Sequence, residues 1–272
     1  MPAARSSGVS GFLPEAPGAI PRRRSGHHDP VPPPQVFAYS GMLRTADDEL
    51  TNAHLLMHAL ALTGCEAPRV CYLPTALGDA EGAVASQRQR FADDFPGVEL
   101  SVLTLFPQPG VPDVRRHLLS QDLLLVEGGS VVNLLAVWRA HGLDAVMREC
   151  WEAGVVLSGV SAGSLCWHRG GPTDSFRDAL DPFTDGLGLL PFSNGVHDDF
   201  DDQPRRTTYR RLVADGTLPP GYASEDGVGL HYVGTELREA VSVRRGAQAW
   251  WVDRDGARPV PTRYLGPAET AG

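Results

Sequence analysis

The chain has 272 residues, of which 42% are hydrophobic and 21% are charged, values typical of a globular protein with a sizeable core. Its formal net charge of −9 argues against a nucleic-acid partner, because such partners select basic surfaces. No apolar run approaches the roughly 18 residues of a membrane-spanning helix. The four cysteines include no C-x-x-C pair, so we expect free buried thiols in a reducing cytoplasm and neither disulfides nor a zinc site.

Residues 1–34 differ in composition from the rest of the chain. They are rich in Pro, Gly, Ser and Arg, end in Pro32-Pro33-Pro34 and show no apolar periodicity. We predict a disordered tail that lacks the apolar core of a secretory signal. Its Arg22-Arg23-Arg24 and His27-His28 are interpreted as solvated. A single folded domain is expected over 35–265, followed by a frayed end over 266–272.

Predicted strands and helices alternate through the first 160 residues. Strands are expected at 36–41, 69–74, 98–105 and 122–126, and from Val155 onward. Helices are expected at 47–62, 80–95, 113–119, 131–140 and 143–151. The uninterrupted apolar run at 123–126 indicates a strand covered on both faces. The alternation predicts a three-layer α/β fold, in which a mostly parallel sheet carries helices on both faces.

After residue 168 the pattern changes. Residues 169–186 are expected to form loops, and an apolar strand at 187–191 is expected to end in a turn at Ser193-Asn194-Gly195. A helix is predicted at 205–214. Strands at 222–233, 239–243 and 247–252 are predicted to form one antiparallel flank.

The sequence Gly159-x-Ser161-x-Gly163 has the G-x-S-x-G pattern of a nucleophile elbow. In such an elbow a serine occupies the apex of a strained turn between a strand and a helix. The residues two positions away must therefore be small, because strand and helix approach closely there. The pattern is weak alone, but here an apolar strand precedes it and Ala162 onward can enter a buried helix. This context favours a catalytic serine over an ordinary Gly-rich turn.

A serine nucleophile needs a base, which is usually histidine. Of the nine histidines, His197 is the best candidate, because it follows a predicted strand on a loop where such sheets carry their chemistry. His168 should point away from the elbow, and His231 lies within a strand. His54 and His58 are spaced to share a metal on one helix face. No third ligand is evident, so we interpret them as surface or core histidines.

A third group should orient the imidazole, and backbone N–H groups should hold the oxyanion. Asp226 and Glu225, at the start of a strand, and Asp174, in a loop, are the candidate acids; any of them could equally be a solvated loop carboxylate. Ala162 follows the serine and can supply one N–H donor. The Gly128-Gly129 turn can supply the other, although it could also be an ordinary strand–helix turn.

Three motifs together resemble the peptidase E (aspartyl dipeptidase) and cyanophycinase family of serine peptidases. They are Gly128-Gly129-Ser130-x-x-Asn133-Leu134-Leu135, the Gly159-x-Ser161-Ala162-Gly163-Ser164 turn, and Gly186-Leu187-Gly188-Leu189-Leu190-Pro191 shortly before His197. The resemblance runs from about Val36 to Val252. In α/β-hydrolases the acid lies between serine and histidine. Here the best-placed acid follows the histidine, which favours the peptidase E family.

The resemblance implies a fold similar to class I glutamine amidotransferases, with serine in place of their elbow cysteine. It implies hydrolysis of a peptide bond near an acidic residue, without metal or cofactor. Ser161 would be the nucleophile and His197 the base, with Asp226 matching the strand-start acid, Glu225 one residue off register and Asp174 an approximate match to another acid of the site. Gly129 and Ala162 would form the oxyanion hole. The expected substrate contacts are Gly128, Ser130, Arg205 and Arg206.

The sequence departs from the dipeptidase at two places, and both concern the inference of the substrate class more than that of the reaction class. The turn at Glu127-Gly128-Gly129-Ser130 stands where the dipeptidase has three glycines and an asparagine, and the match around Arg205 is poor. We therefore predict a cytoplasmic serine peptidase for small peptides, with a homodimer left open. The alternatives are an esterase or acyl hydrolase using the same serine, and an inert binding protein on this fold.

Overall fold

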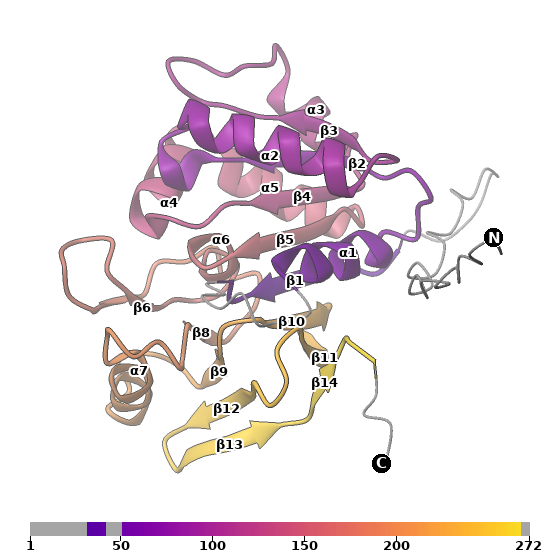
Figure 1. The fold of residues 1–272 in the computed structure, drawn as a ribbon. Coiled ribbons are helices and arrows are strands. Elements are labelled where there is room, and N and C mark those ends of the chain that lie inside the picture. The colour runs from indigo at the N-terminus through magenta and orange to yellow at the C-terminus, as the bar shows by residue number, and fades with distance from the viewer. Residues whose placement is uncertain (1–31, 42–50, 268–272) are drawn as a thin grey trace, which may run out of the picture.

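The computed structural model describes residues 32–41 and 51–267 (Figure 1). The tails predicted at 1–34 and 266–272 lie mostly outside these ranges and stay predictions. So does the start of the helix predicted from residue 47, which within the described residues begins at Asn52.

An eight-stranded sheet forms the centre of the molecule, in the order β14-β11-β10-β1-β5-β4-β2-β3. Five neighbouring strands, β1, β5, β4, β2 and β3, run parallel to one another, and β10 pairs antiparallel with β1. This confirms the predicted α/β fold with a mostly parallel sheet. The strands are β1 (Gln35–Tyr39), β2 (Arg69–Leu73), β3 (Glu99–Val102), β4 (Leu123–Val126), β5 (Val156–Val160), β10 (Val228–Val233), β11 (Glu236–Ser242) and β14 (Thr262–Tyr264).

Helices cover both faces of this sheet (Figure 1). In β1, Phe37 and Tyr39 pack with α1 and α2, whereas Val36 and Ala38 pack with the helices of the other face. The alternation follows from the two-residue period of a strand. The first face carries α1 (Asn52–Leu62) and α2 (Glu81–Asp94), and the second α3 (Val114–Leu119), α4 (Val131–Ala140), α5 (Leu143–Glu152) and the short α6 (Ala162–Leu165). Within the described ranges, none of the helices has both the length and the apolar character needed to cross a bilayer.

A second, four-stranded sheet lies beside the first, in the order β13-β12-β9-β8. It is covered by α7 (Arg205–Ala214), whose Tyr209, Leu212 and Val213 form a small separate core with Ala223 and Val252. Its strands are β8 (Ser193–Val196), β9 (Gly221–Ser224), β12 (Ala249–Asp253) and β13 (Gly256–Val260). The predicted antiparallel pairing of the C-terminal strands holds for β9 with β12 and for β10 with β11, but these strands divide between two sheets and do not form one flank.

The division falls inside the stretch predicted as one strand, 222–233. The chain turns between β9 and β10, where Gly227 has φ 82° and the Val228 N–H bonds to the Glu225 carbonyl at 3.1 Å. Only a residue tolerant of positive φ fits this turn, so the two apolar halves enter different sheets.

The strand near residue 190 lies later in the chain than predicted. The apolar segment 187–191 is not a strand, and the polar segment predicted as a turn is β8. A Cβ on Gly195 would lie 2.5 Å from the Tyr209 ring, so this glycine allows α7 to pack directly on the strand. Within the loop predicted at 169–186, β6 (Gly171–Thr173) and β7 (Asp181–Phe183) form a short antiparallel ribbon.

Candidate active site

Ser161 occupies the sharp turn between β5 and α6. Its backbone has φ 54° and ψ −112°, an uncommon conformation for a residue other than glycine. The Ser161 N–H bonds to the Tyr39 carbonyl at 3.0 Å, and its carbonyl accepts the Leu165 N–H at 2.9 Å. Gly163 packs so closely beneath the turn that a Cβ there would lie 2.3 Å from the Val126 carbonyl oxygen. The turn thus holds the hydroxyl at the carboxyl edge of the parallel strands.

His197 directly follows β8 and meets the serine at this edge. Its Nε2 lies 2.8 Å from the Ser161 Oγ, and the residue is only 2% exposed. The His197 backbone also has positive φ, at 58°, and its N–H bonds to the Ser40 hydroxyl at 3.2 Å. This backbone bond fixes the loop from which the imidazole reaches the serine.

Asp226 completes a continuous chain of hydrogen bonds. Its Oδ1 lies 2.5 Å from His197 Nδ1, on the side of the ring opposite the serine. Asp226 follows β9, and His197 follows the parallel neighbour β8, so both side chains leave the same edge of the second sheet. The Asp226 backbone is held by Asp199, which accepts its N–H at 2.7 Å, and by Arg244, which donates to its carbonyl at 3.2 Å.

The other two candidate acids bind arginines. Glu225 accepts a bond from Arg206 at 2.9 Å and the Gln248 N–H at 2.9 Å. Asp174 accepts a bond from Arg205 at 3.0 Å. Neither carboxylate hydrogen-bonds to His197 within residues 32–41 and 51–267. Glu225 and Asp226 both lie in the turn between β9 and β10 and not at the start of a strand, and in this turn Asp226 is directed at the imidazole whereas Glu225 is directed at Arg206.

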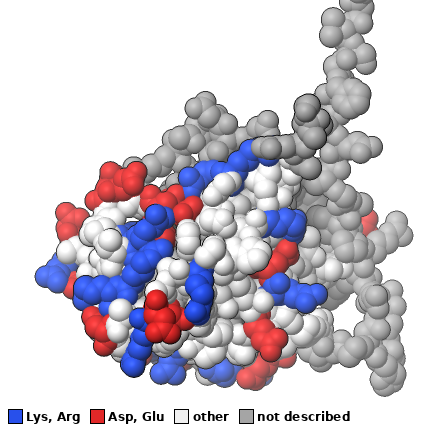
Figure 2. Space-filling view, turned by 90° about the horizontal axis from the view of Figure 1, so that it is seen from below, with Lys and Arg blue, Asp and Glu red and all other residues white. Residues whose placement is uncertain are grey.

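The two arginines predicted to contact substrate differ in environment. Arg206 is paired with Asp198 at 2.9 Å as well as with Glu225. Arg205 is 8% exposed, and its Nε has no hydrogen-bond partner among the described residues. Burial lowers the pKa of the Arg205 guanidinium, whereas the charges of Asp174 and Asp226 act in the opposite direction. Arginine and acidic side chains intermingle on the lower face of the molecule (Figure 2).

The glycine turn after β4 lies against Ser161. A Cβ on Gly128 would lie 3.3 Å from the Ser161 Cβ, and one on Gly129, whose φ is 131°, would lie 2.4 Å from the Ala76 carbonyl. In the described part of the chain, neither the Gly129 N–H nor the Ala162 N–H has an acceptor. Ser130 instead caps α4, its hydroxyl accepting the Asn133 N–H at 3.2 Å. Its hydroxyl is therefore engaged in helix capping.

Sequence reasoning missed the residues that hold the His197 and Asp226 backbones. The Ser40 hydroxyl donates to the Ser224 carbonyl at 3.1 Å while it accepts the His197 N–H. Asp199 and Arg244 also bind each other. For Ser40, the one sequence signal for a role in holding the site backbone was its position directly after the first strand. Asp199 and Arg244 carry no local signal, because they meet through tertiary contacts.

The buried His168 lies outside this arrangement, as expected. Its Nδ1 donates to the Ser164 carbonyl at 2.9 Å, and its Nε2 lies 3.4 Å from the Tyr232 hydroxyl. Burial lowers the pKa of His168 to about 4, so the ring is neutral.

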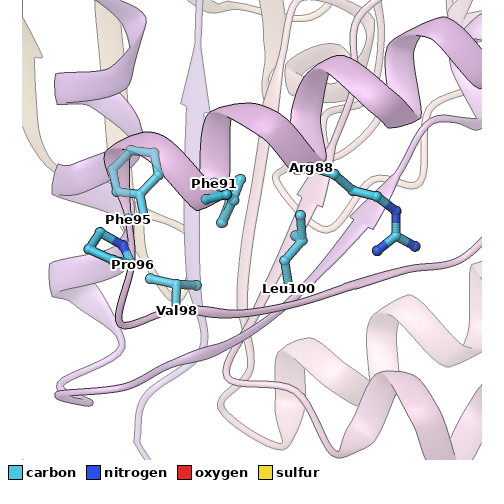
Figure 3. A pocket seen from close by; sticks show the side chains of 7 residues that line it. Arg88, Phe91, Phe95, Pro96, Val98 and Leu100 are labelled. Carbon is cyan, nitrogen blue, oxygen red and sulfur yellow. The ribbon is translucent and has the colours of Figure 1, made fainter.

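Two cavities differ in their relation to the site. One of about 90 Å³ adjoins the ends of β4 and β5 and is lined in part by Glu127, Val160 and Arg90. The other, of about 350 Å³, lies between α2 and β3 at the far edge of the sheet (Figure 3). The lining of the second cavity is mostly apolar, with Arg88 as its charged member and no nucleophile or histidine.

Comparisons with known proteins match the chain to a peptidase family. The model of Peptidase family S51 matches residues 40–240. The chain is 38% identical over 226 residues to the uncharacterized peptidase YgaJ of Bacillus subtilis (strain 168), covering 80% of this chain and 94% of that protein.

Two solved structures share the fold. A crystal structure of a peptidase from an acI-B1 actinobacterium has a TM-score of 0.60 at 15% identity, covering 85% of this chain and 95% of its own. A putative peptidase E protein from Listeria monocytogenes EGD-e has a TM-score of 0.53 at 19% identity, covering 75% and 96%.

The fold and the family match together define a peptidase, a hydrolase of peptide bonds. Within that class, the chain belongs to peptidase family S51, the peptidase E family.

Proposed function

We propose that the protein is a serine peptidase that hydrolyses small peptides through an acyl-enzyme on Ser161. The observation that carries this proposal is the chain of short contacts in which His197 binds the Ser161 hydroxyl at 2.8 Å and Asp226 at 2.5 Å. A nucleophile, a base and an orienting acid in hydrogen-bond contact are the combination that acyl transfer requires.

In the first step, His197 Nε2 removes the hydroxyl proton as Ser161 Oγ attacks the peptide carbonyl. A tetrahedral intermediate forms, and the carbon–nitrogen bond breaks as His197 protonates the leaving amine. Water then attacks the acyl-enzyme with the same imidazole as base, releasing the carboxylic acid and restoring the serine. Asp226 holds the Nδ1 proton throughout and stabilises the imidazolium.

The N–H groups of Gly129 and Ala162 would bind the oxyanion. Support comes from the contact of the glycine turn with Ser161 and from the absence of an acceptor for either N–H within the described residues. Two preorganised donors at this position stabilise charge that develops only in the transition state, and loss of one typically costs on the order of 10²–10³ in rate.

Arg205 supports a preference for an acidic substrate residue. Its guanidinium is buried, and the negative charge of Asp226 raises its pKa against the effect of burial. Its Nε has no partner among residues 32–41 and 51–267. The Asp174 side chain that now binds it is 40% exposed. A substrate carboxylate could therefore bind Arg205 beside, or in place of, Asp174.

The test is covalent labelling followed by substrate profiling. A fluorophosphonate should label the wild-type chain on Ser161, located by mass spectrometry, and should fail to label Ser161→Ala. A dipeptide library, with and without aspartate at each position, and a matched set of esters then define the substrate. Unchanged labelling or peptidase activity in a folded Ser161→Ala variant would reject the serine mechanism. Cleavage of esters alone would favour the esterase alternative.

A further inference from the structure

Three metal-ligating side chains converge outside the triad, on the α1 face of the central sheet. His58 comes from α1, His231 from β10 and Glu239 from β11, and one ligand atom of each lies within 4.8 Å of the others. His231 and Glu239 are direct partners in the β10–β11 register. Directly opposite residues of antiparallel strands share a face, and His58 reaches that face by packing on Phe37, with ring centroids 5.1 Å apart.

His231 presents an unused nitrogen to this cluster. The residue is 6% exposed, and its Nε2 lies 2.9 Å from the Gln35 side-chain oxygen. That oxygen accepts the ring proton, which leaves a lone pair on Nδ1. This Nδ1 is buried and has no hydrogen-bond partner in the described part of the chain. An imidazole oriented by an amide oxygen through its other nitrogen is the usual arrangement of a metal-binding histidine.

His58 and Glu239 also have free bonding capacity. The His58 Nε2 lies 3.3 Å from Glu239 Oε1, yet it makes no well-aligned hydrogen bond to any described residue. Arg263 holds the other carboxylate oxygen, Oε2, at 2.8 Å and so leaves Oε1 directed at the histidines. Among the described residues the buried His231 Nδ1 has no partner and the His58 Nε2 has only the Glu239 carboxylate beside it, an arrangement that a bound cation would satisfy.

We propose that His58, His231 and Glu239 bind a divalent transition metal, with Zn²⁺ as the best fit. Two imidazoles and one carboxylate are a donor set that zinc accepts, with the fourth position left for water. Ligand atoms on a tetrahedral zinc lie about 3.3 Å apart, which matches the His58–Glu239 distance. The remaining separations, at most 4.8 Å, close with small side-chain rotations.

The electrostatics permit this ligand. Burial lowers the pKa of both His58 and His231, and the lone pair on His231 Nδ1 follows from the hydrogen bond of its other nitrogen to Gln35. The opposing charges are Arg263, which binds Glu239, and Arg238, whose charge also reaches His231. The metal would join α1 to the β10–β11 pair. His54, one turn earlier on the helix, would take no part, because His58 meets its partners on β10 and β11.

The experiment measures zinc binding to the untagged full-length chain. His27→Ser and His28→Ser are introduced first, because the N-terminal histidines could bind the same metals. Competition with a chromogenic chelator should give one Zn²⁺ per chain. His231→Gln and Glu239→Gln should each weaken binding at least tenfold, whereas His54→Gln and the exposed control His141→Gln should retain it.

Failure to retain zinc, or unchanged affinity in His231→Gln, would overturn the proposal. Loss of binding in His54→Gln would also overturn it, since the metal would then sit on the helix face. Should the ligand variants not fold, Co²⁺ binding to the parent chain decides. An intense visible spectrum typical of four-coordinate cobalt supports the site, and only the weak six-coordinate spectrum rejects it.

Discussion

Gly159 and Gly163 touch across the turn that carries Ser161. A Cβ on Gly159 would lie 2.2 Å from the carbonyl oxygen of Gly163 and 2.5 Å from its carbonyl carbon. Both obstacles are backbone atoms, which cannot rotate away. Any side chain at residue 159 must therefore separate β5 from α6 and shift the serine between them.

Gly159→Ala is expected to lower kcat/KM by about 10²-fold, because a displacement of the nucleophile of about 1 Å has that effect. It should also lower the free energy of unfolding by about 1–3 kcal/mol through overpacking. Gly82→Ala, in α2, is the matched control, since nothing lies within 4 Å of a Cβ there. That change should stabilise the helix by about 0.5–1 kcal/mol and leave kcat/KM unchanged. Wild-type kinetics in Gly159→Ala would contradict the tight elbow.

Asp226 and Glu225 are adjacent acids with different partners, which permits a matched comparison. Asp226→Asn should reduce kcat by roughly 10³–10⁴-fold, because the amide cannot hold the productive imidazole tautomer. Glu225→Gln removes the charge that pairs with Arg206 and faces Arg244 but leaves the bond between Asp226 and His197 in place, so its effect on kcat should stay below about tenfold. Steady-state kinetics on one dipeptide compares the two. Equal losses would mean that Asp226 is not the orienting acid.

Arg205 and Arg206 offer a similar comparison for substrate choice. Arg205→Gln should reduce kcat/KM for an aspartyl dipeptide by about 10–100-fold more than for its neutral analogue, the range expected for one charged hydrogen bond. Arg206→Gln should affect both substrates equally, because Arg206 is already paired with Asp198 and Glu225. The measured quantity is the ratio of kcat/KM values for the two peptides. An unchanged ratio in Arg205→Gln would exclude Arg205 from recognition of the acidic group.

His168 makes the stability of the fold depend on pH. Its pKa is lowered to about 4 by burial, below the ordinary value of 6.5, so the unfolded chain binds the proton more readily. Its contribution is complete above about pH 6.5 and decreases as the pH falls toward 4. Between pH 6.5 and 5 this costs about 2 kcal/mol of unfolding free energy.

His168→Gln cannot take up this proton, so urea unfolding at several pH values should give it a smaller loss of stability on acidification than the wild type shows. Exchange of the neutral His168 ring for an amide lowers stability at pH 7.5, which is why the pH dependence is compared and not the absolute value. Identical pH dependence in both chains would show that His168 is not protonated on unfolding in this range.

Local sequence pattern was sufficient to predict the parallel half of the fold and the sharp turn that carries Ser161. Apolar runs such as 123–126 and the Gly159-x-Ser161-x-Gly163 turn carry their own signal, because burial on both faces and close backbone approach each demand particular residues at fixed spacing. The same reasoning selected His197, which does follow a strand, although that strand is β8 and not the apolar segment 187–191.

Tertiary structure decided what depends on contacts between distant segments. Polar Ser193–Val196 forms a strand because it pairs with β9, with Tyr209 packed on Gly195. The apolar stretch 222–233 divides because Gly227 turns the chain between two sheets. Asp226, not Glu225 or Asp174, meets His197 because β8 and β9 end side by side. His58 likewise lies next to two strand residues that are 173 and 181 positions along the chain from it. Such pairings follow from register and packing, and a single sequence has no periodicity that reports them.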